Sequence, residues 1–258
     1  MTRETLPLGA IRRVTAVDAV RARITMAVQL GLLAPGERLP VPEVAAAALG
    51  VSAMSVRRAY RQLDDEGMLR RARGRTGGTF VADDPVSTQP PALAALAAFD
   101  DDRDLVHALI DERAAIETGL AVVAAGRADR TDALAELDAL VERMSVAVDW
   151  ADFRDADGRF HRLLAEAARM PAAAELHHRV ASELYAYFLP YRIDYLRASN
   201  HEHRDILEAL RRGDAGALGA AVHAHIVELH ESMYVALAQR LEPATEPVST
   251  PTRVSDRG

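Results

Sequence analysis

The sequence contains no cysteine, which excludes disulfide bonds and every zinc site built on thiolates. Aromatic residues are also scarce, at 5% of 258 residues, so a core formed from the 49% of hydrophobic residues must be mainly aliphatic. No apolar run approaches the roughly 18 residues of a membrane-spanning helix. No charged start followed by an apolar segment indicates a signal peptide. These absences predict a cytoplasmic protein with no membrane partner.

Lysine is absent as well, and the arginines are unevenly distributed. Residues 1–82 hold 13 arginines against 7 acidic residues, a charge of +6, whereas the remainder holds 18 against 31, a charge of −13. A basic segment followed by an acidic one is expected where only the first meets a phosphate backbone. The length suits two domains. The composition therefore predicts a two-domain protein whose first domain contacts nucleic acid.

Residues 39–67 have the pattern of two helices joined by a tight turn. Pro42 is suited to the first turn of a helix that runs to Leu49. Gly50 can adopt the positive φ that the turn requires, and Ser52 is a good N-cap for a second helix over residues 53–66. This arrangement predicts a helix-turn-helix.

The residues that follow Gly67 predict a wing beside the second helix. Residues 68–81 form two short strand-like segments around a turn rich in glycine and arginine. A helix with exposed arginines and a basic wing beside it favours DNA as the partner. The candidate DNA contacts are Ser52, Ser55, Arg57, Arg58, Arg61, Arg73, Arg75 and Thr76.

The rest of the chain predicts one more helix before this motif and an all-helical domain after it. The first helix covers residues 17–30, and a proline-rich segment marks the boundary between the domains. The later helices are expected over residues 104–125, 129–147, 151–168, 172–188, 191–212 and 215–241. The expected divisions are a DNA-binding domain at 1–84, a linker at 85–102, a helical domain at 103–242 and a disordered tail at 243–258.

Both halves resemble one known family of regulators. The spacing of Gly31, residues 35–40 (Pro-Gly-Glu-Arg-Leu-Pro), residues 49–52 (Leu-Gly-Val-Ser) and Glu66-Gly67 resembles the DNA-binding domain of GntR regulators. Arg113, residues 157–161 (Asp-Gly-Arg-Phe-His) and Glu202-His203 resemble the FCD effector domain of the FadR-like subfamily. The resemblance implies a mainly α fold, with a winged helix-turn-helix followed by an all-α FCD-like bundle. It also implies a homodimer that binds a pseudo-palindromic operator and responds to a small organic acid.

The resemblance to FCD domains implies a metal site at Asp157, His161, His203 and His225. Asp157 and His161 are four residues apart and so share one face of a helix. His203 and His225 lie on the next two predicted helices, which an antiparallel turn could bring level. One carboxylate and three imidazoles suit a divalent cation, with zinc preferred over nickel or manganese. The alternative is a cluster of core histidines that bind one another.

Arg113 has two possible roles. With a glutamate one turn later, it can form an ordinary ion pair. In the FCD family an arginine here commonly points into the cavity, and its fork of donors can bind a ligand carboxylate. Four further residues are candidates for the cavity rim: Tyr185, Tyr187, Tyr191 and Arg192.

The chain departs from the GntR pattern on the DNA-binding surface. Glu43 and Ala53 stand where the family usually has arginines that grip the operator, so that only Arg57 of the trio remains. The operator sequence therefore cannot be carried over from the family. The arginines expected to replace the lost contacts are Arg58, Arg61, Arg73 and Arg75.

Three classes of function are compatible with these patterns. The preferred one is a repressor that binds double-stranded operator DNA and is controlled by a small carboxylate in a metal-containing cavity. The second is a regulator for which the metal itself is the signal. The third is a metal-dependent hydrolase, but no clear general base lies beside the metal ligands in the sequence, so we expect no enzyme.

Overall fold

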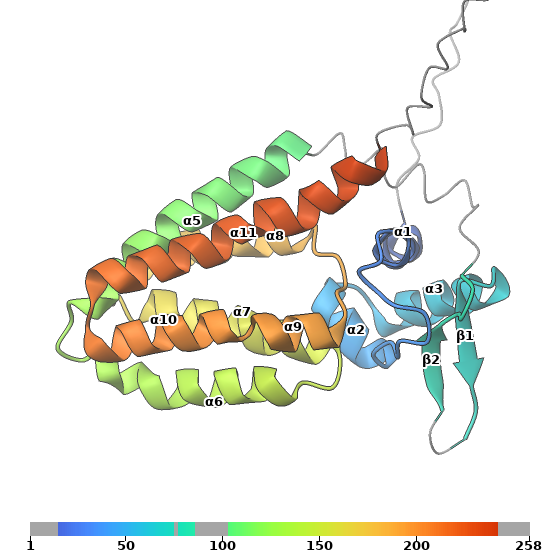
Figure 1. Ribbon diagram of the computed structural model, residues 1–258, viewed down its shortest axis with the longest axis horizontal. Coiled ribbons are helices and arrows are strands. Elements are labelled where there is room, and N and C mark those ends of the chain that lie inside the picture. The colour runs from blue at the N-terminus through green and yellow to red at the C-terminus, as the bar shows by residue number, and fades with distance from the viewer. Residues whose placement is uncertain (1–14, 75–76, 86–102, 242–258) are drawn as a thin grey trace, which may run out of the picture.

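The computed structural model describes residues 15–74, 77–85 and 103–241, and these form a winged domain at one end of a helical bundle (Figure 1). The predicted fold class, mainly α with a small β wing, is confirmed. Apart from Pro85, the expected linker lies outside the described residues, as does the expected tail at 243–258. No helix within the described ranges is long and apolar enough to cross a membrane.

The winged domain forms as its cap and turn residues predict. Its elements are α1 (Ala16–Gln29), α2 (Pro42–Leu49), α3 (Ala53–Asp65), β1 (Leu69–Ala72) and β2 (Gly78–Val81). The side chain of Thr15 caps α1, and Gly50 ends α2 with a φ of 65°. β1 and β2 are antiparallel, with Leu69 opposite Val81.

The second domain is a bundle of long helices. Its elements are α5 (Arg103–Ala125), η1 (Arg130–Ala133), α6 (Leu134–Val146), α7 (Trp150–Glu166), α8 (Pro171–Tyr185), α9 (Ile193–Ser199), α10 (His201–Arg212) and α11 (Ala215–Leu241). α5 runs along α11 (Figure 1). A Cβ atom on Gly219 would lie 2.8 Å from a methyl carbon of Val122, so this glycine permits the close approach of the two helices.

The single helix predicted over residues 191–212 is wrong, because Asn200 divides it into α9 and α10. Asn200 is fully buried, and its amide donates hydrogen bonds of 2.9 Å to the carbonyl oxygen of Val141 and the hydroxyl of Ser145. Both partners belong to α6. A long-range contact thus sets the break, and no local sequence signal predicts it.

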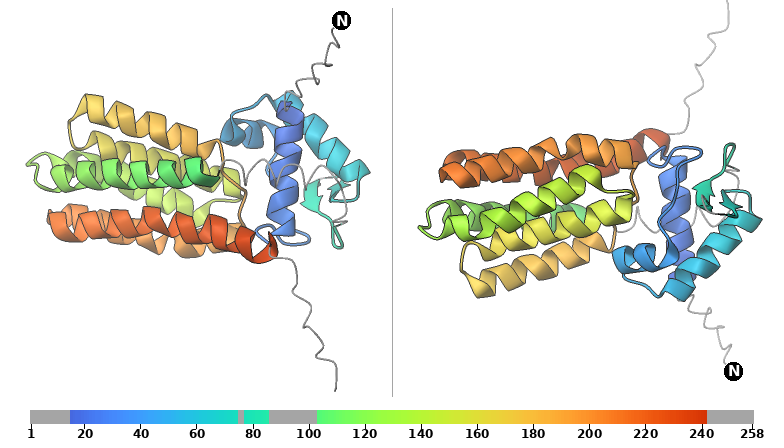
Figure 2. Two further views of the ribbon diagram at one scale, coloured as in Figure 1. Left: turned by 90° about the horizontal axis from the view of Figure 1, so that it is seen from above. Right: turned by 90° about the horizontal axis from the view of Figure 1, so that it is seen from below.

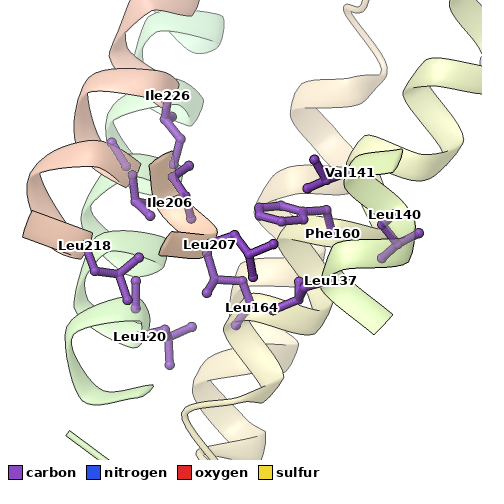
Figure 3. Packing of buried hydrophobic residues seen from close by; sticks show 14 of the residues in the cluster. Leu120, Leu137, Leu140, Val141, Phe160, Leu164, Ile206, Leu207, Leu218 and Ile226 are labelled. Atoms are coloured by element: carbon purple, nitrogen blue, oxygen red, sulfur yellow. The ribbon is translucent and has the colours of Figure 1, made fainter. Parts of the chain in front are cut away.

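The bundle core is mainly aliphatic, with the aromatic rings of Phe153 and Phe160 among the described residues. Phe160 of α7 is fully buried, in a cluster with leucines and isoleucines of α5, α6, α10 and α11 (Figure 3). This core holds together the helices that bear the predicted metal ligands, because His161 follows Phe160 directly on α7. Packing of this kind keeps such side chains at fixed separations.

The two domains meet through their cores. α1 lies across the end of the bundle in both views of Figure 2. Trp150 and Ala151, the first residues of α7, are buried in the core of the winged domain, and Met26 of α1 joins the core of the bundle. The backbone N–H of Ile193 also donates to the carboxylate of Glu37 at 3.3 Å. A displacement in the bundle therefore has a direct route to the winged domain.

Candidate metal centre and DNA interface

The structure brings the four predicted metal ligands together. One ligand atom from each of Asp157, His161, His203 and His225 lies within 4.8 Å of the others. α7 supplies Asp157 and His161 on one face, and the turn after α10 sets His203 and His225 level with each other. The Nε2 atoms of His161 and His225 are 3.2 Å apart, and Nε2 of His203 lies 3.1 Å from Oδ1 of Asp157. Three nitrogens and one oxygen therefore converge on one point.

Carboxylates orient two of the three imidazoles from behind. Nδ1 of His161 is hydrogen-bonded to Glu117, and Nδ1 of His225 lies 2.5 Å from Glu202. The hydroxyl of Tyr185 donates to the second oxygen of Asp157 at 3.1 Å. A carboxylate on the outer nitrogen of a histidine fixes its ring orientation and tautomer, and it is the usual outer shell of a metal-binding histidine.

Glu117 is the hub of this outer shell. It is completely buried and accepts hydrogen bonds from Arg113 at 3.0 Å and from His177 at 2.8 Å, in addition to its contact with His161. Burial opposes ionisation, but His161 and Arg113 outweigh it and hold the pKa of Glu117 well below its usual value. Glu117 therefore remains a carboxylate, and the sequence had indicated it only as a neighbour of Arg113.

The histidines differ in their affinity for protons. Burial lowers the pKa of His203 to about 4, so its imidazole is neutral and can offer a lone pair. For His161 burial acts in the same direction, but the carboxylate of Glu117 outweighs it and raises the pKa to about 9. Burial would raise the pKa of Asp157, yet His161 holds that pKa well below its usual range.

A cavity of about 120 Å³ opens beside the cluster. Its walls include Arg113, Asp157 and two of the histidines, together with apolar and aromatic side chains. Arg113 is 2% exposed; its Nε binds Glu117, while one terminal nitrogen is buried without a hydrogen-bond partner among the described residues. A buried donor that lacks an acceptor is costly, and the carboxylate of a ligand would satisfy it.

The predicted rim residues divide into two groups. Tyr185 and Tyr191 line the cavity, whereas Tyr187 does not, and Arg192 forms a surface ion pair with Asp194. Nine further lining residues were not predicted as part of the cavity: Phe153, Arg154, Leu184, Phe188, Tyr195, Leu196, Ser199, Glu202 and Glu228. Phe153 and Arg154 had an available signal, because they precede the predicted ligand Asp157 by about one helical turn. Glu202 had another, because it stands beside the predicted ligand His203 in the sequence.

The second candidate site is the exposed face of α3. Its buried residues, Val56, Ala59, Tyr60 and Leu63, pack on the domain core. Arg57, Arg58 and Arg61 are exposed, as the sequence predicts. Ser52 caps the helix by accepting a 3.1 Å hydrogen bond from the N–H of Ser55. The start of α3 is therefore rigid, and its arginines point away from the core.

A hollow of about 270 Å³ separates α3 from the wing, and four arginines line it: Arg38, Arg57, Arg61 and Arg71. Arg38 and Arg71 were not among the predicted contacts. Arg38 reaches the wing because it forms an isolated β-bridge with Phe80, a pairing that local patterns do not reveal. Among the predicted wing contacts Arg73 is exposed, whereas Arg75 and Thr76 lie outside the described residues.

Glu43 is paired with Arg57. The two side chains form an ion pair at the surface, with exposures of 55% and 48%. Glu43 stands where the family usually has an arginine. It pairs with Arg57, which is the one remaining arginine of the three that usually grip the operator. An exposed pair is weak, about 0–1 kcal/mol, so a phosphate or a base edge can displace it.

Two family models match the chain. The model described as "Bacterial regulatory proteins, gntR family" matches residues 16–81, and the model of the FCD domain matches residues 105–228. Together they span both domains. The matched ranges contain all four convergent ligand residues and the described part of the candidate DNA contacts.

Several relatives have similar sequences. RmpR of Mycobacterium gastri, a putative HTH-type transcriptional regulator, is 32% identical over 64% of this chain, which spans 60% of that protein. A putative L-lactate dehydrogenase operon regulatory protein of Escherichia coli (strain K12) is 29% identical over 84% of this chain and 85% of its own length. The regulator LutR of Bacillus subtilis is 28% identical over 78% of this chain and 93% of its own length. Among solved structures, Streptococcus agalactiae GntR is 25% identical over 84% of this chain and 99% of its own, with a TM-score of 0.44.

Proposed function

The chain belongs to the GntR family of bacterial regulatory proteins, with an FCD domain behind its winged helix, and we propose that it is a homodimeric repressor controlled by a small carboxylate bound beside a divalent metal. That it is a DNA-binding transcriptional regulator, and not an enzyme, follows from the two families and from the relatives. The hydrolase alternative is thereby removed.

The observation that carries the proposal is the position of Arg113 beside the four convergent ligands. Three imidazole nitrogens and one carboxylate oxygen suit zinc, and nickel or manganese could also bind to them. When bound, such a cation would offer an anionic oxygen an electrostatic partner inside the cavity. The buried donor of Arg113 would hold another oxygen of the same ligand. The name of the lactate-operon relative supports a small organic acid as effector.

Removal of the metal should abolish the response to the acid. We expect L-lactate or L-malate to change the operator affinity of zinc-loaded protein by a factor of about 5–150, and dialysis against a chelator to reduce that factor to about 1. Fluorescence anisotropy with labelled operator measures both states. Restoration by zinc is the control. If chelation alone, without acid, produces the full change, the metal is the signal and the proposed carboxylate effector is wrong.

A dimer is needed because one winged helix covers one half-site. α5 offers a face for it: Leu105 and Val123 are exposed at 50% and 41% and lie about five turns apart on the same side of the helix. We expect light scattering to give a mass twice 28.0 kDa. Val123→Glu should shift this toward the monomer, whereas Val148→Glu, at an exposed valine outside the helix, should not. A 28.0 kDa wild-type species both on and off DNA would contradict the dimer.

A further inference from the structure

Arg154 is a second arginine in the effector cavity. It lies on α7 one turn before Asp157 and lines the same cavity as Arg113. Its guanidinium carbon is 4.6 Å from the centre of the Tyr185 ring and 5.1 Å from that of Phe188. Arg113 lies 5.6 Å from the same Tyr185 ring. The guanidinium groups of Arg113 and Arg154 therefore both lie against the ring of Tyr185.

Arg154 has no counter-ion within the described part of the chain. No carboxylate there lies within ion-pair distance of it, and its Nε is buried without a hydrogen-bond partner. By contrast, Arg143, beside the same helix, binds two aspartates at 2.7 Å each. Burial lowers the pKa of Arg154, although Tyr185, Asp157 and Asp155 act in the opposite direction. Arg154 is half-buried, and a cation withdrawn from water is stabilised by an anionic partner, so a ligand carboxylate would be favoured beside it.

The acidic residues of the cavity are already engaged or lie at its edge. Asp157 accepts hydrogen bonds from Tyr185 and His203, and Glu202 binds His225. Glu228 also lines the cavity but is exposed. None of these carboxylates forms a direct ion pair with Arg154 within the described residues, so a ligand carboxylate can take that position.

Arg154 also faces the winged domain. Burial, and then the charge of Arg154, lower the pKa of Arg23 on α1, so two like charges oppose each other at the domain junction. Arg23 donates to the carbonyl oxygen of Ala186, just after α8. Phe188, which contacts Arg154, lies 6.0 Å from Trp150 of the winged-domain core, measured between ring centres.

We propose that the effector is a dicarboxylate whose second carboxylate binds Arg154, and that this contact transmits occupancy of the cavity to α1. The inference rests on the proposed function, which places the first carboxylate at Arg113. A carboxylate on Arg154 neutralises the charge that repels Arg23 and so strengthens the docking of α1 on the bundle. The small volume of the cavity, about 120 Å³, suits a short acid.

Calorimetric titration of the zinc-loaded full-length protein with L-malate and L-lactate tests the proposal. The two acids share a 2-hydroxycarboxylate, and malate adds a second carboxylate. We expect malate to bind about 10- to 100-fold more tightly, the range for a charged hydrogen bond to a buried partner. Arg154→Gln should reduce the ratio of the two affinities to about 1. Arg159→Gln, on the exposed side of the same helix and paired with Glu136, should leave the ratio unchanged.

A second variant tests the transmission. Arg23→Gln removes the opposing charge on α1, so its operator affinity without acid should move toward that of the malate-bound wild type. If malate and lactate bind wild type equally and Arg154→Gln changes neither, the dicarboxylate inference is wrong while the proposed function stands. If neither acid binds the zinc-loaded protein, the proposed function fails and the inference fails with it. An Arg23→Gln variant with wild-type operator affinity would overturn the transmission.

Discussion

Replacing Arg57 with alanine should lower the affinity for operator DNA by about 1–3 kcal/mol at each half-site, or roughly 5- to 150-fold. Arg57 is exposed near the start of α3, the part of a recognition helix that contacts base edges, and it lines the hollow beside the wing. The operator can be selected from a random pool with the wild-type protein. Anisotropy titrations of the selected duplex and of a scrambled duplex then measure specific and non-specific binding.

Three variants give this measurement its controls. Arg73→Ala, on the wing, should weaken binding to all sequences. It should also reduce the slope of log affinity against log salt concentration by about 1. Glu43→Gln should raise affinity a few-fold, because the surface pair that occupies Arg57 is lost. Arg159→Ala removes an equal charge far from α3 and should have little effect. Full operator affinity in Arg57→Ala at moderate salt would show that the recognition surface lies elsewhere.

Replacing His203 with alanine should abolish the response to the acid while operator binding is retained. His203 is 1% exposed on α10, binds Asp157 and supplies one of the four convergent ligand atoms. Loss of one ligand from such a site weakens cation binding. We therefore expect the factor by which acid changes operator affinity to fall from about 5–150 to about 1.

His201 provides the matched control for this variant. It lies on the same helix and is exposed, and its Nδ1 lies 2.9 Å from the carbonyl oxygen of Ala198. His201→Ala should respond to acid as the wild type does. His203→Gln, which keeps a polar side chain in the buried position, separates loss of the cation from loss of stability, and thermal melts establish that each variant is folded. A normal acid response in both His203 variants would contradict the assignment of the site.

Local signals in the sequence predict much of this fold. Ser52 and Gly50 mark the ends of the motif helices because capping and positive φ depend on neighbouring residues. The exposed arginines of α3 follow from helical spacing. The convergence of His203 and His225 follows from the turn between α10 and α11, for which Gly213 adopts a φ of 68°.

Features that depend on distant contacts could not be predicted in this way. Asn200 breaks a helix only because α6 lies beside it. Trp150 belongs to the core of the winged domain although it begins a helix of the bundle, since the docking of the two domains decides its surroundings. The pairing of Glu43 with Arg57 joins two helices across the motif. For Arg154, spacing shows the shared helix face, but the missing counter-ion is visible only when all neighbouring helices are in place.

The central claim is that the metal-containing cavity and the operator are coupled. Because coupling between two binding sites is reciprocal, operator DNA must change the affinity for the acid by the factor by which the acid changes operator affinity. The direct measurement is calorimetric titration of zinc-loaded wild type, with and without saturating operator, using whichever of L-lactate and L-malate binds more tightly. We predict two acid affinities that differ about 5- to 150-fold, and no difference for His203→Ala. Equal affinities in the two wild-type titrations would contradict the account.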